Sequence, residues 1–350
     1  MSNETVLVTG GTGFLAGHCV ARLVRDGYQV RFTVRSVDSA RAVQRTLEAA
    51  SVPTESLTFA VTDLTADANW AEAVKGCDYV LAVASPLPRR VLRNAADVTG
   101  PARDAALRVL RFARDAGVRR VVFTSSFAAI GYGYARSRTR AFTEQDWTRH
   151  DSLSVPSYIR AKTLAERAAW DYVEQHGAGR EGNGLELAVV NPVGMFGPVL
   201  GPRLPGSAGI VKAMLEGELP RTPRLWTSVV DVRDVADLHV LAMTSPKAAG
   251  ERFLAAAGDA VSYHHIARTL RERLGDEASG VPDRDMSSFY VRTMAPFVPP
   301  LRQFRRNLDV IRHTDSSKAR DLLGWRPRSA EDAVTATARS LIDQHLISQA

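Results

Sequence analysis

Cysteine is almost absent from this sequence: Cys19 and Cys77 are the only two among 350 residues. Two cysteines exclude a disulfide framework, and they have neither a CxxC spacing nor the spacing of a metal site. No run of about 18 apolar residues is present, which excludes a transmembrane helix, and no cationic, apolar signal segment follows Met1. We therefore expect a reduced, cytoplasmic setting, with no membrane partner and no bound metal.

Lysine is also scarce, since five lysines stand beside 40 arginines. The formal net charge of +7 could attract an acidic partner, but the arginines are spread along the whole chain and alternate with Asp and Glu. No zinc-finger spacing, RNP aromatic motif or basic leucine heptad accompanies them. The charge therefore predicts a solvated, arginine-rich surface and no nucleic-acid partner.

Apolar, β-branched runs alternate with helical segments in the first half of the chain, which is typical of a parallel sheet with helices on both faces. Proline and glycine crowd residues 192–206, and the chain from residue 262 onward is mainly helical. The predicted strands are residues 6–8, 29–34, 57–61, 79–83, 120–124 and 185–190, and a further strand is expected at 226–232.

This alternation predicts an α/β fold, a Rossmann-type doubly wound parallel sheet with a smaller, mostly helical C-terminal substrate lobe. Residues 1–190 are expected to form the nucleotide-binding core, completed by about 226–257. Residues 191–225 and 258–350 are expected to form the substrate-binding lobe.

A glycine-rich turn follows the first predicted strand and opens the first predicted helix. It consists of Gly10, Thr12, Gly13, Phe14 and Leu15 with their neighbours. Gly10 permits a tight turn, and Gly13 lets the backbone approach a pyrophosphate that the helix N-terminus would hold. A glycine-rich turn alone is a weak signal, but its strand–turn–helix setting predicts a dinucleotide cofactor.

Tyr158 and Lys162 form a Y-x-x-x-K pair on a predicted helix, where a spacing of four residues puts both side chains on one face. A phenol with a pKa near 10 is a poor acid–base group at neutral pH, and a nearby ammonium favours its ionised form. Lys162 is one of only five lysines, and a guanidinium would not replace an ammonium in this role. The pair predicts a tyrosine that exchanges a proton with a substrate.

The T-G-x-x-G-x-x-A motif from Thr9 to Ala16, together with the Y-x-x-x-K pair, resembles the extended branch of the short-chain dehydrogenase/reductases. This branch belongs to the NAD-dependent epimerase/dehydratase superfamily. Within it, nearly the whole chain resembles the group of dihydroflavonol reductases, cinnamoyl-CoA reductases and microbial aldehyde (methylglyoxal) reductases. The segments that carry this second resemblance include residues 84–86, 230–236 and 323–327.

The resemblance implies a nicotinamide cofactor, and the end of the second strand discriminates NAD from NADP. An acidic residue there would accept from the ribose 2′-hydroxyl, whereas an arginine can pair with a 2′-phosphate. Arg35 stands at this point and predicts NADP(H), with Arg31 and Arg41 as secondary candidates. The resemblance implies further cofactor contacts from Asp63 and Leu64 (adenine), Ala84 and Ser85 (nicotinamide ribose), Pro192 and Val193 (nicotinamide), and Ser207 (adenosine phosphate). Asp63 could equally cap the helix that follows it.

The resemblance also implies a serine at the end of the fifth strand that polarises the substrate carbonyl. Ser126 matches by position, and Ser125 is the alternative. Ser126, Tyr158 and Lys162 would then form the catalytic set: NADPH delivers hydride to the carbonyl carbon, Tyr158 donates a proton to the oxygen, and Lys162 holds the ribose. The predicted function is an NADPH-dependent carbonyl reductase that reduces small or medium aldehydes and ketones to alcohols.

Two departures from the group's sequence patterns narrow the range of expected substrates. Gly131 stands where dihydroflavonol reductases carry Asn or Asp, and Val155-Pro156-Ser157 precedes the tyrosine in place of the aromatic cinnamoyl-CoA reductase signature. Both argue against those substrates. The basic loop 136–140 could bind an anionic substrate or be a solvated loop. Loops near the reactive centre are expected to supply the substrate pocket, namely Leu87, Phe127, Ile130, Tyr132, Phe196, Met214 and Trp226.

Three alternative functions share parts of this pattern. A hydroxysteroid dehydrogenase acting in the oxidative direction, or a dihydroflavonol-type reductase, could be separated from this function only by substrate profiling. An NAD-dependent sugar-nucleotide epimerase or dehydratase shares the glycine turn and the tyrosine–lysine pair, but Arg35 argues against it. A non-catalytic nucleotide-sensing regulator would use the fold without chemistry and would not need that pair. Members of the group are monomers or dimers, so we expect a monomer or a homodimer.

Overall fold

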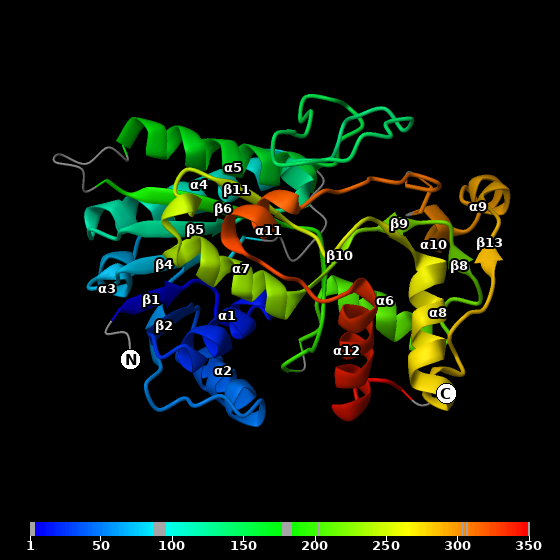
Figure 1. The fold of residues 1–350 in the computed structure, drawn as a ribbon, viewed down its shortest axis with the longest axis horizontal. Helices are drawn as coiled ribbons and strands as arrows, with labels where there is room; N and C mark the ends of the chain where they lie inside the picture. Colours follow the sequence, from blue (N-terminus) through cyan, green and yellow to red (C-terminus); the bar gives the residue numbers. More distant parts are fainter. Residues whose placement is uncertain are drawn as a thin grey trace.

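A seven-stranded parallel sheet forms the centre of the protein (Figure 1). The computed structural model describes residues 4–86, 96–176, 184–201, 203–302, 304–305 and 307–348. The strand order is β11-β6-β5-β4-β1-β2-β3, and every neighbouring pair runs parallel. The strands are β1 (Thr5–Val8), β2 (Gln29–Val34), β3 (Thr58–Val61), β4 (Tyr79–Ala82), β5 (Arg120–Thr124), β6 (Glu186–Pro192) and β11 (Arg252–Ala255).

Helices cover both faces of the sheet, because successive residues of each strand point to opposite sides. In β1, Val6 and Val8 pack into one buried cluster and Leu7 packs into the other. The first face carries α1 (Phe14–Arg25), α2 (Val37–Ala49), α7 (Val232–Thr244) and α11 (Ser317–Leu323). The second carries α3 (Trp70–Val74), α4 (Ala96–Asp115) and α5 (Ser157–His176). The predicted doubly wound sheet is therefore confirmed.

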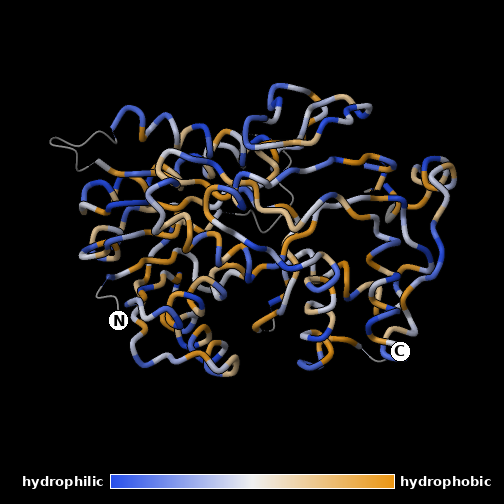
Figure 2. The backbone as a smooth tube through the Cα atoms, in the orientation of Figure 1, coloured by the Kyte–Doolittle hydropathy of each residue, from blue (hydrophilic) through white to orange (hydrophobic). Residues whose placement is uncertain are grey.

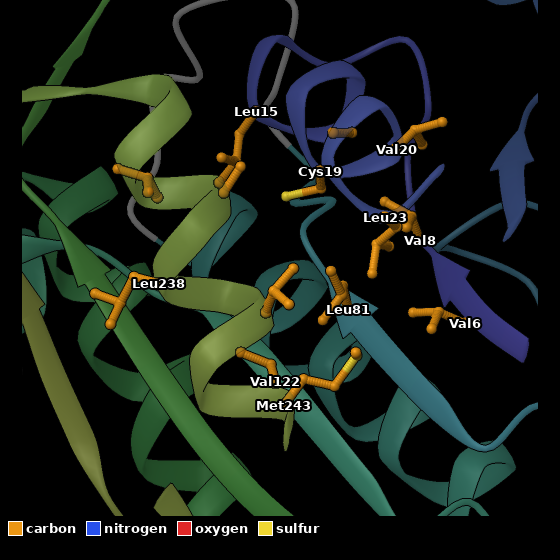
Figure 3. Close-up of a cluster of buried hydrophobic side chains, with 14 of the residues drawn as sticks. Val6, Val8, Leu15, Cys19, Val20, Leu23, Leu81, Val122, Leu238 and Met243 are labelled. Atoms are coloured by element: carbon orange, nitrogen blue, oxygen red, sulfur yellow. The ribbon is translucent and has the colours of Figure 1, made fainter. Parts of the chain in front are cut away.

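The cluster on the first face joins elements far apart in the chain. Figure 3 shows Val6 and Val8 of β1 beside Cys19 and Leu23 of α1, with Leu238 of α7 on the far side of the same cluster. Figure 2 shows hydrophobic stretches concentrated in the interior and hydrophilic residues along the outer turns. Among the described residues, none of the helices has the length and apolarity needed to cross a membrane.

Six predicted strands are confirmed to within two residues at each end, but the strand expected at 226–232 is wrong as a single element. The chain breaks at Ser228 into β9 (Trp226–Thr227) and β10 (Val229–Asp231), and neither joins the central sheet. The Asp231 side chain accepts from the Arg233 amide (2.9 Å), so α7 begins directly after β10. The seventh strand is β11, whose short apolar run does not reveal which strand it pairs with.

A smaller, mostly helical lobe follows β6 (Figure 1). Its main core packs the inner sides of α6, α8 and α12 against β7 and β10. Its helices are α6 (Gly206–Leu215), α8 (Tyr263–Leu274), α9 (Ser288–Met294), α10 (Pro299–Arg302) and α12 (Ala330–Asp343). Its strand pairs are β7 (Gly194–Phe196) with β10, β8 (Thr222–Pro223) with β13 (Asp285–Met286), and β9 with β12 (Val261–Ser262). The expected division of the chain at residues 190, 225 and 257 stays a prediction.

Candidate active site

A cleft of about 1250 Å³ lies at the carboxyl ends of the parallel strands. The loops after β1, β2, β3, β4, β5 and β6 all contribute to its wall. The strand order reverses direction between β1 and β4, because β2 and β3 extend the sheet on one side of this pair and β5 and β6 on the other. Ligands of open α/β sheets bind at such a switch point.

The glycine-rich turn forms one part of this wall and presents a helix N-terminus to it. Gly10 adopts a positive φ of +71°, and a Cβ there would lie 2.7 Å from the Ala84 Cβ, so only glycine fits. The Gly13 amide donates to the Gly10 carbonyl (2.8 Å), and among the described residues no side chain caps α1. Amides of an uncapped first turn bind anions, so this turn suits a pyrophosphate. Gly10, Thr12, Gly13, Phe14 and Leu15 all line the cleft.

Of the three arginines considered for a 2′-phosphate, Arg35 alone lines the cleft. The Arg31 guanidinium donates to the carbonyls of Ala73 (2.8 Å) and Lys75 (2.9 Å). Arg41 pairs with Asp38 at the surface (3.5 Å). Arg35 lies next to Ser36, whose hydroxyl accepts from the Ser39 amide and caps α2, and both serines share the cleft wall. This corner can therefore offer a cation and hydroxyl groups to a phosphate.

Asp63 and Leu64 line the same end of the cleft. The Asp63 carboxylate accepts from both the amide (2.7 Å) and the hydroxyl (2.6 Å) of Thr65. These hydrogen bonds, with smaller effects of Arg35 and Arg108, lower the pKa of Asp63. The alternative considered for Asp63, the N-cap of the following helix, is wrong: α3 begins at Trp70 with Asn69 at its N-cap, and Asp63 caps only the turn at Thr65.

Ser126, Tyr158 and Lys162 line the part of the cleft that follows β5 and β6, and Ala84, Ser85, Pro192 and Val193 line the same cleft. The Ser126 Oγ accepts from the Ala128 amide (3.1 Å) and caps the short 3₁₀ helix η1 (Phe127–Ala129). An accepting hydroxyl keeps its own proton for donation. The Ser125 hydroxyl, in contrast, is buried and donates to Glu166 (2.5 Å). Of the two serines, Ser126 is the one whose proton no described residue accepts.

Tyr158 and Lys162 lie one turn apart on α5 and differ in burial. Tyr158 is 43% exposed and Lys162 only 8%. Burial lowers the pKa of Lys162 to about 8, against an opposing effect of Glu166. Burial, reinforced by Tyr132, raises the pKa of Tyr158. This direction is opposite to the lowering expected from the sequence, because desolvation of the phenolate is the largest effect. A protonated phenol is nevertheless the form that donates a proton in a reduction.

The residues expected to form the substrate pocket fall into separate places. Phe127, Ile130 and Tyr132 pack with Phe142 and Leu254 in a cluster directly beside Ser126. Phe196 and Met214 are fully buried in the core of the lobe, away from the cleft wall, and Trp226 is half-buried in β9. The Ser207 hydroxyl donates to the Met195 carbonyl and is likewise outside the wall. Leu87 lies outside the described residues.

The basic loop 136–140 makes structural contacts of its own. The Arg138 guanidinium pairs with Asp146 (2.9 Å) and lies over the rings of Tyr134 and Phe142. The sequence patterns did not indicate two other charged groups near the site. Arg203 lines the cleft and donates to the Thr12 hydroxyl (3.5 Å), and Glu166 lies buried behind the catalytic end. Arg203 sits in a proline- and glycine-rich loop that has no periodic signal.

Comparison with known proteins agrees with this geometry. The family model described as the NAD dependent epimerase/dehydratase family matches residues 6–256. Dihydroflavonol 4-reductase of Zea mays is 32% identical over 279 residues, covering 77% of this chain and 74% of the maize protein. A Candida albicans protein assigned as an NADPH-dependent methylglyoxal reductase is 32% identical over 304 residues, covering 82% and 87% of the two chains.

A solved structure extends the similarity to the lobe. Gre2 of Candida albicans in complex with NADPH superposes with a TM-score of 0.79 at 25% identity, covering 98% of this chain and 99% of that one. These relatives confirm the predicted resemblance to this group of reductases. They also confirm the prediction that the chain is an oxidoreductase. The fold, the glycine turn and the family match lead to one conclusion: the chain belongs to the NAD dependent epimerase/dehydratase family.

Proposed function

We propose that this protein is an NADPH-dependent carbonyl reductase that reduces small or medium aldehydes and ketones. The observation that carries the proposal is the placement of Ser126, Tyr158 and Lys162 in a cleft that also holds an uncapped helix N-terminus and Arg35. The relatives named for NADPH support the choice of cofactor. The absence of an acidic residue at the end of β2 supports it further.

The proposed chemistry divides between two parts of the cleft. The first-turn amides of α1 would bind the pyrophosphate, and Arg35 would bind the 2′-phosphate through charge-assisted hydrogen bonds. NADPH, when bound, would supply the hydride. The Ser126 hydroxyl would donate a hydrogen bond to the substrate carbonyl, and Tyr158 would transfer its phenolic proton to that oxygen as negative charge develops. Lys162, as an ammonium, would bind a ribose hydroxyl and stabilise the tyrosinate left behind.

Tyr132, which contributes to the raised pKa of Tyr158, belongs to an aromatic cluster that does not itself line the cleft. Phe127 and Tyr132 pack edge to face with centroids 6.0 Å apart, and the Arg312 guanidinium lies 4.4 Å from the Tyr132 ring centroid. Both cysteines are unpaired and buried, which fits the cytoplasmic setting that we propose. A monomer or homodimer stays a prediction.

The proposal is tested by NADPH consumption against a panel of aldehydes, ketones, β-ketoesters and flavanonols. We expect turnover of several aldehydes or ketones by the wild type. The Tyr158→Phe variant should lose activity by about 10²- to 10⁴-fold and still bind NADPH within about threefold of wild type. No turnover of any carbonyl, or full activity of the variant, would refute the assignment. NAD that copurifies with the protein and does not exchange would favour an epimerase or dehydratase instead.

A further inference from the structure

Glu166 is a buried carboxylate one helical turn beyond Lys162 on α5, and the proposed reaction gives it no part. Its side chain is completely buried. It accepts hydrogen bonds from three different strands: from the Ser125 hydroxyl at the end of β5 (2.5 Å), the Asn191 amide of β6 (2.7 Å) and the Arg252 Nε of β11 (2.5 Å). All three partners donate, and one of them is a guanidinium, so the acceptor capacity of this buried carboxylate is used by three separate segments.

Arg252 makes hydrogen bonds and a ring contact besides its pair with Glu166, and these contacts fix the position of the Glu166 carboxylate. Arg252 is 8% exposed, and its Nη1 donates to the carbonyls of Glu144 (2.7 Å) and Asp146 (3.2 Å). Its guanidinium lies 3.7 Å from the centroid of the Trp147 ring. The planar fork of an arginine loses little freedom in such a setting. The ion pair therefore anchors α5 to β11, the strand at the edge of the sheet.

The same carboxylate reaches the catalytic end through its other two partners. Ser125 directly precedes Ser126, and the Asn191 amide that donates to Glu166 also donates to the Ser126 carbonyl (3.2 Å). Asn191 in turn directly precedes Pro192 in the cleft wall. The ends of β5 and β6 are thus joined through one carboxylate behind the cleft.

The charged groups around Lys162 determine how readily its ammonium keeps its proton. Among the described residues, Glu166 is the charged group whose field raises the pKa of Lys162, against the lowering by burial. The neighbouring elements offer no other compensating charge within the part of the chain that the structure describes. The 3₁₀ helix η1 (Phe127–Ala129) and the ends of β5 and β6 contribute uncharged residues, and α4 packs Ala102 against Ala161 and Ala165 of α5. Tyr158 and Arg160 are the other ionisable groups on this turn of α5, and the Arg160 guanidinium donates to the Ser152 carbonyl (3.5 Å).

We propose that Glu166 is the positioning residue of the active site: its carboxylate, fixed by Arg252, aligns the strand ends that carry Ser126 and Pro192 and places a negative charge one helical turn beyond Lys162. This inference rests on the proposed reductase function for its catalytic meaning. The substitution Glu166→Gln removes the negative charge of this side chain. Glutamine keeps the volume and one accepting oxygen, but its amide nitrogen replaces the other accepting oxygen with a donor.

A control ion pair, with a partly exposed carboxylate, lies at the opposite end of the same two strands. Arg120, at the start of β5, is buried and pairs with Glu186, at the start of β6 (Nη2–Oε2 2.6 Å). Arg120 also donates to three backbone carbonyls at the end of α7 and just beyond it. Glu186→Gln therefore breaks a carboxylate–guanidinium pair between β5 and β6 without touching the cleft.

The direct test is an NMR titration of Lys162 in protein labelled with ¹³Cε-lysine. The chain has only five lysines, so the spectrum is simple, and Lys162→Met assigns the signal. We expect the wild-type signal to titrate near the pKa of about 8. Glu166→Gln should lower the pKa of Lys162 by about one to two pH units, as expected for one charge on the adjacent helical turn. Glu186→Gln and Arg252→Lys, which keep the Glu166 charge, should leave it within about 0.3 units.

Kinetics provide a second readout with a distinctive pH dependence. With saturating NADPH, Glu166→Gln should lower kcat/KM for the carbonyl substrate about 5- to 50-fold at pH 8, where its Lys162 is mostly neutral. Near pH 5.5 the loss should nearly disappear, because the lysine is protonated in both proteins. A purely structural defect would persist at both pH values.

The outcomes are separable. A folded Glu166→Gln protein whose Lys162 titrates as in the wild type would overturn the proposal, as would an equal shift in Arg252→Lys. If Glu166→Gln does not fold, the Glu166→Gln/Arg252→Met double variant avoids leaving an unpaired buried charge. A smaller downward shift is expected from it, because the Arg252 cation is removed together with the Glu166 anion. Failure of the wild type to reduce any carbonyl would refute the proposed function. The NMR result would still decide whether Glu166 controls Lys162.

Discussion

Replacing Arg35 by glutamate should change the cofactor preference of the enzyme. Arg35 stands at the end of β2, exposed and in the cleft wall beside Ser36 and Ser39. It is also near enough to Asp63 to contribute to the lowered pKa of that carboxyl. In the proposed function its guanidinium meets the 2′-phosphate, which is the group that distinguishes NADPH from NADH. Arg35→Glu removes this cation and places an anion at the same site.

The size of the effect follows from the exposure of this corner. A hydrogen bond to a charged group is worth about 1.5–3 kcal/mol net, and the exposed position of Arg35 favours the lower half of that range. Repulsion between the new carboxylate and the phosphate adds about 1 kcal/mol per charge pair at 4 Å in water. A total of about 3 kcal/mol corresponds to roughly a 100-fold rise in the KM for NADPH. The KM for NADH should change by no more than about twofold.

The assay compares both cofactors on one carbonyl substrate, at low and high salt. Arg41→Glu is the control, because Arg41 is an exposed arginine of α2 that pairs with Asp38 outside the cleft. Its reversal should leave both KM values nearly unchanged. High salt should reduce the rise in the KM for NADPH that Arg35→Glu causes, since the contact between this side chain and the phosphate is exposed to solvent. An equal rise for NADPH and NADH, or the same loss in Arg41→Glu, would refute the assignment of Arg35 to the phosphate.

Two further predictions concern stability. His239 is fully buried and burial lowers its pKa to about 4, so the unfolded chain, with a pKa near 6.5, binds the proton first. The free energy of unfolding should therefore fall by about 2 kcal/mol per such histidine between pH 7.5 and pH 5, with His18 behaving alike. Denaturant titrations at both pH values test this, and a His239→Gln variant that keeps the full pH dependence would contradict it. Gly11→Ala would place a Cβ 2.6 Å from the buried Phe32 ring and should cost about 1–3 kcal/mol. Gly209→Ala, with open space around it, should be neutral or mildly stabilising; similar melting temperatures for the two variants would argue against the clash.

Local patterns in the sequence are sufficient for the parallel sheet and for the parts of the site that consist of short motifs. The alternation of Val6, Leu7 and Val8 between two clusters is a period of two that the sequence displays directly. The glycine turn and the tyrosine–lysine pair are also local, since a few neighbouring residues determine a tight turn or the face of a helix. These features, together with the family resemblance, are enough to predict the cofactor turn and the catalytic helix.

Contacts between distant segments are decided by the tertiary structure alone. The run at 226–232 is apolar enough for a central strand, yet only packing determines that β11 takes the place beside β6. The contacts of Glu166 within the site are likewise not predictable from the sequence. Its partners Ser125, Asn191 and Arg252 lie 41, 25 and 86 residues away, and no spacing rule connects them. Likewise, the sequence offers Arg31, Arg35 and Arg41 as phosphate ligands, and the fold directs only Arg35 into the cleft wall. Local backbone preferences are encoded within a few residues, whereas the position of a charge relative to a cleft depends on how every strand and helix packs.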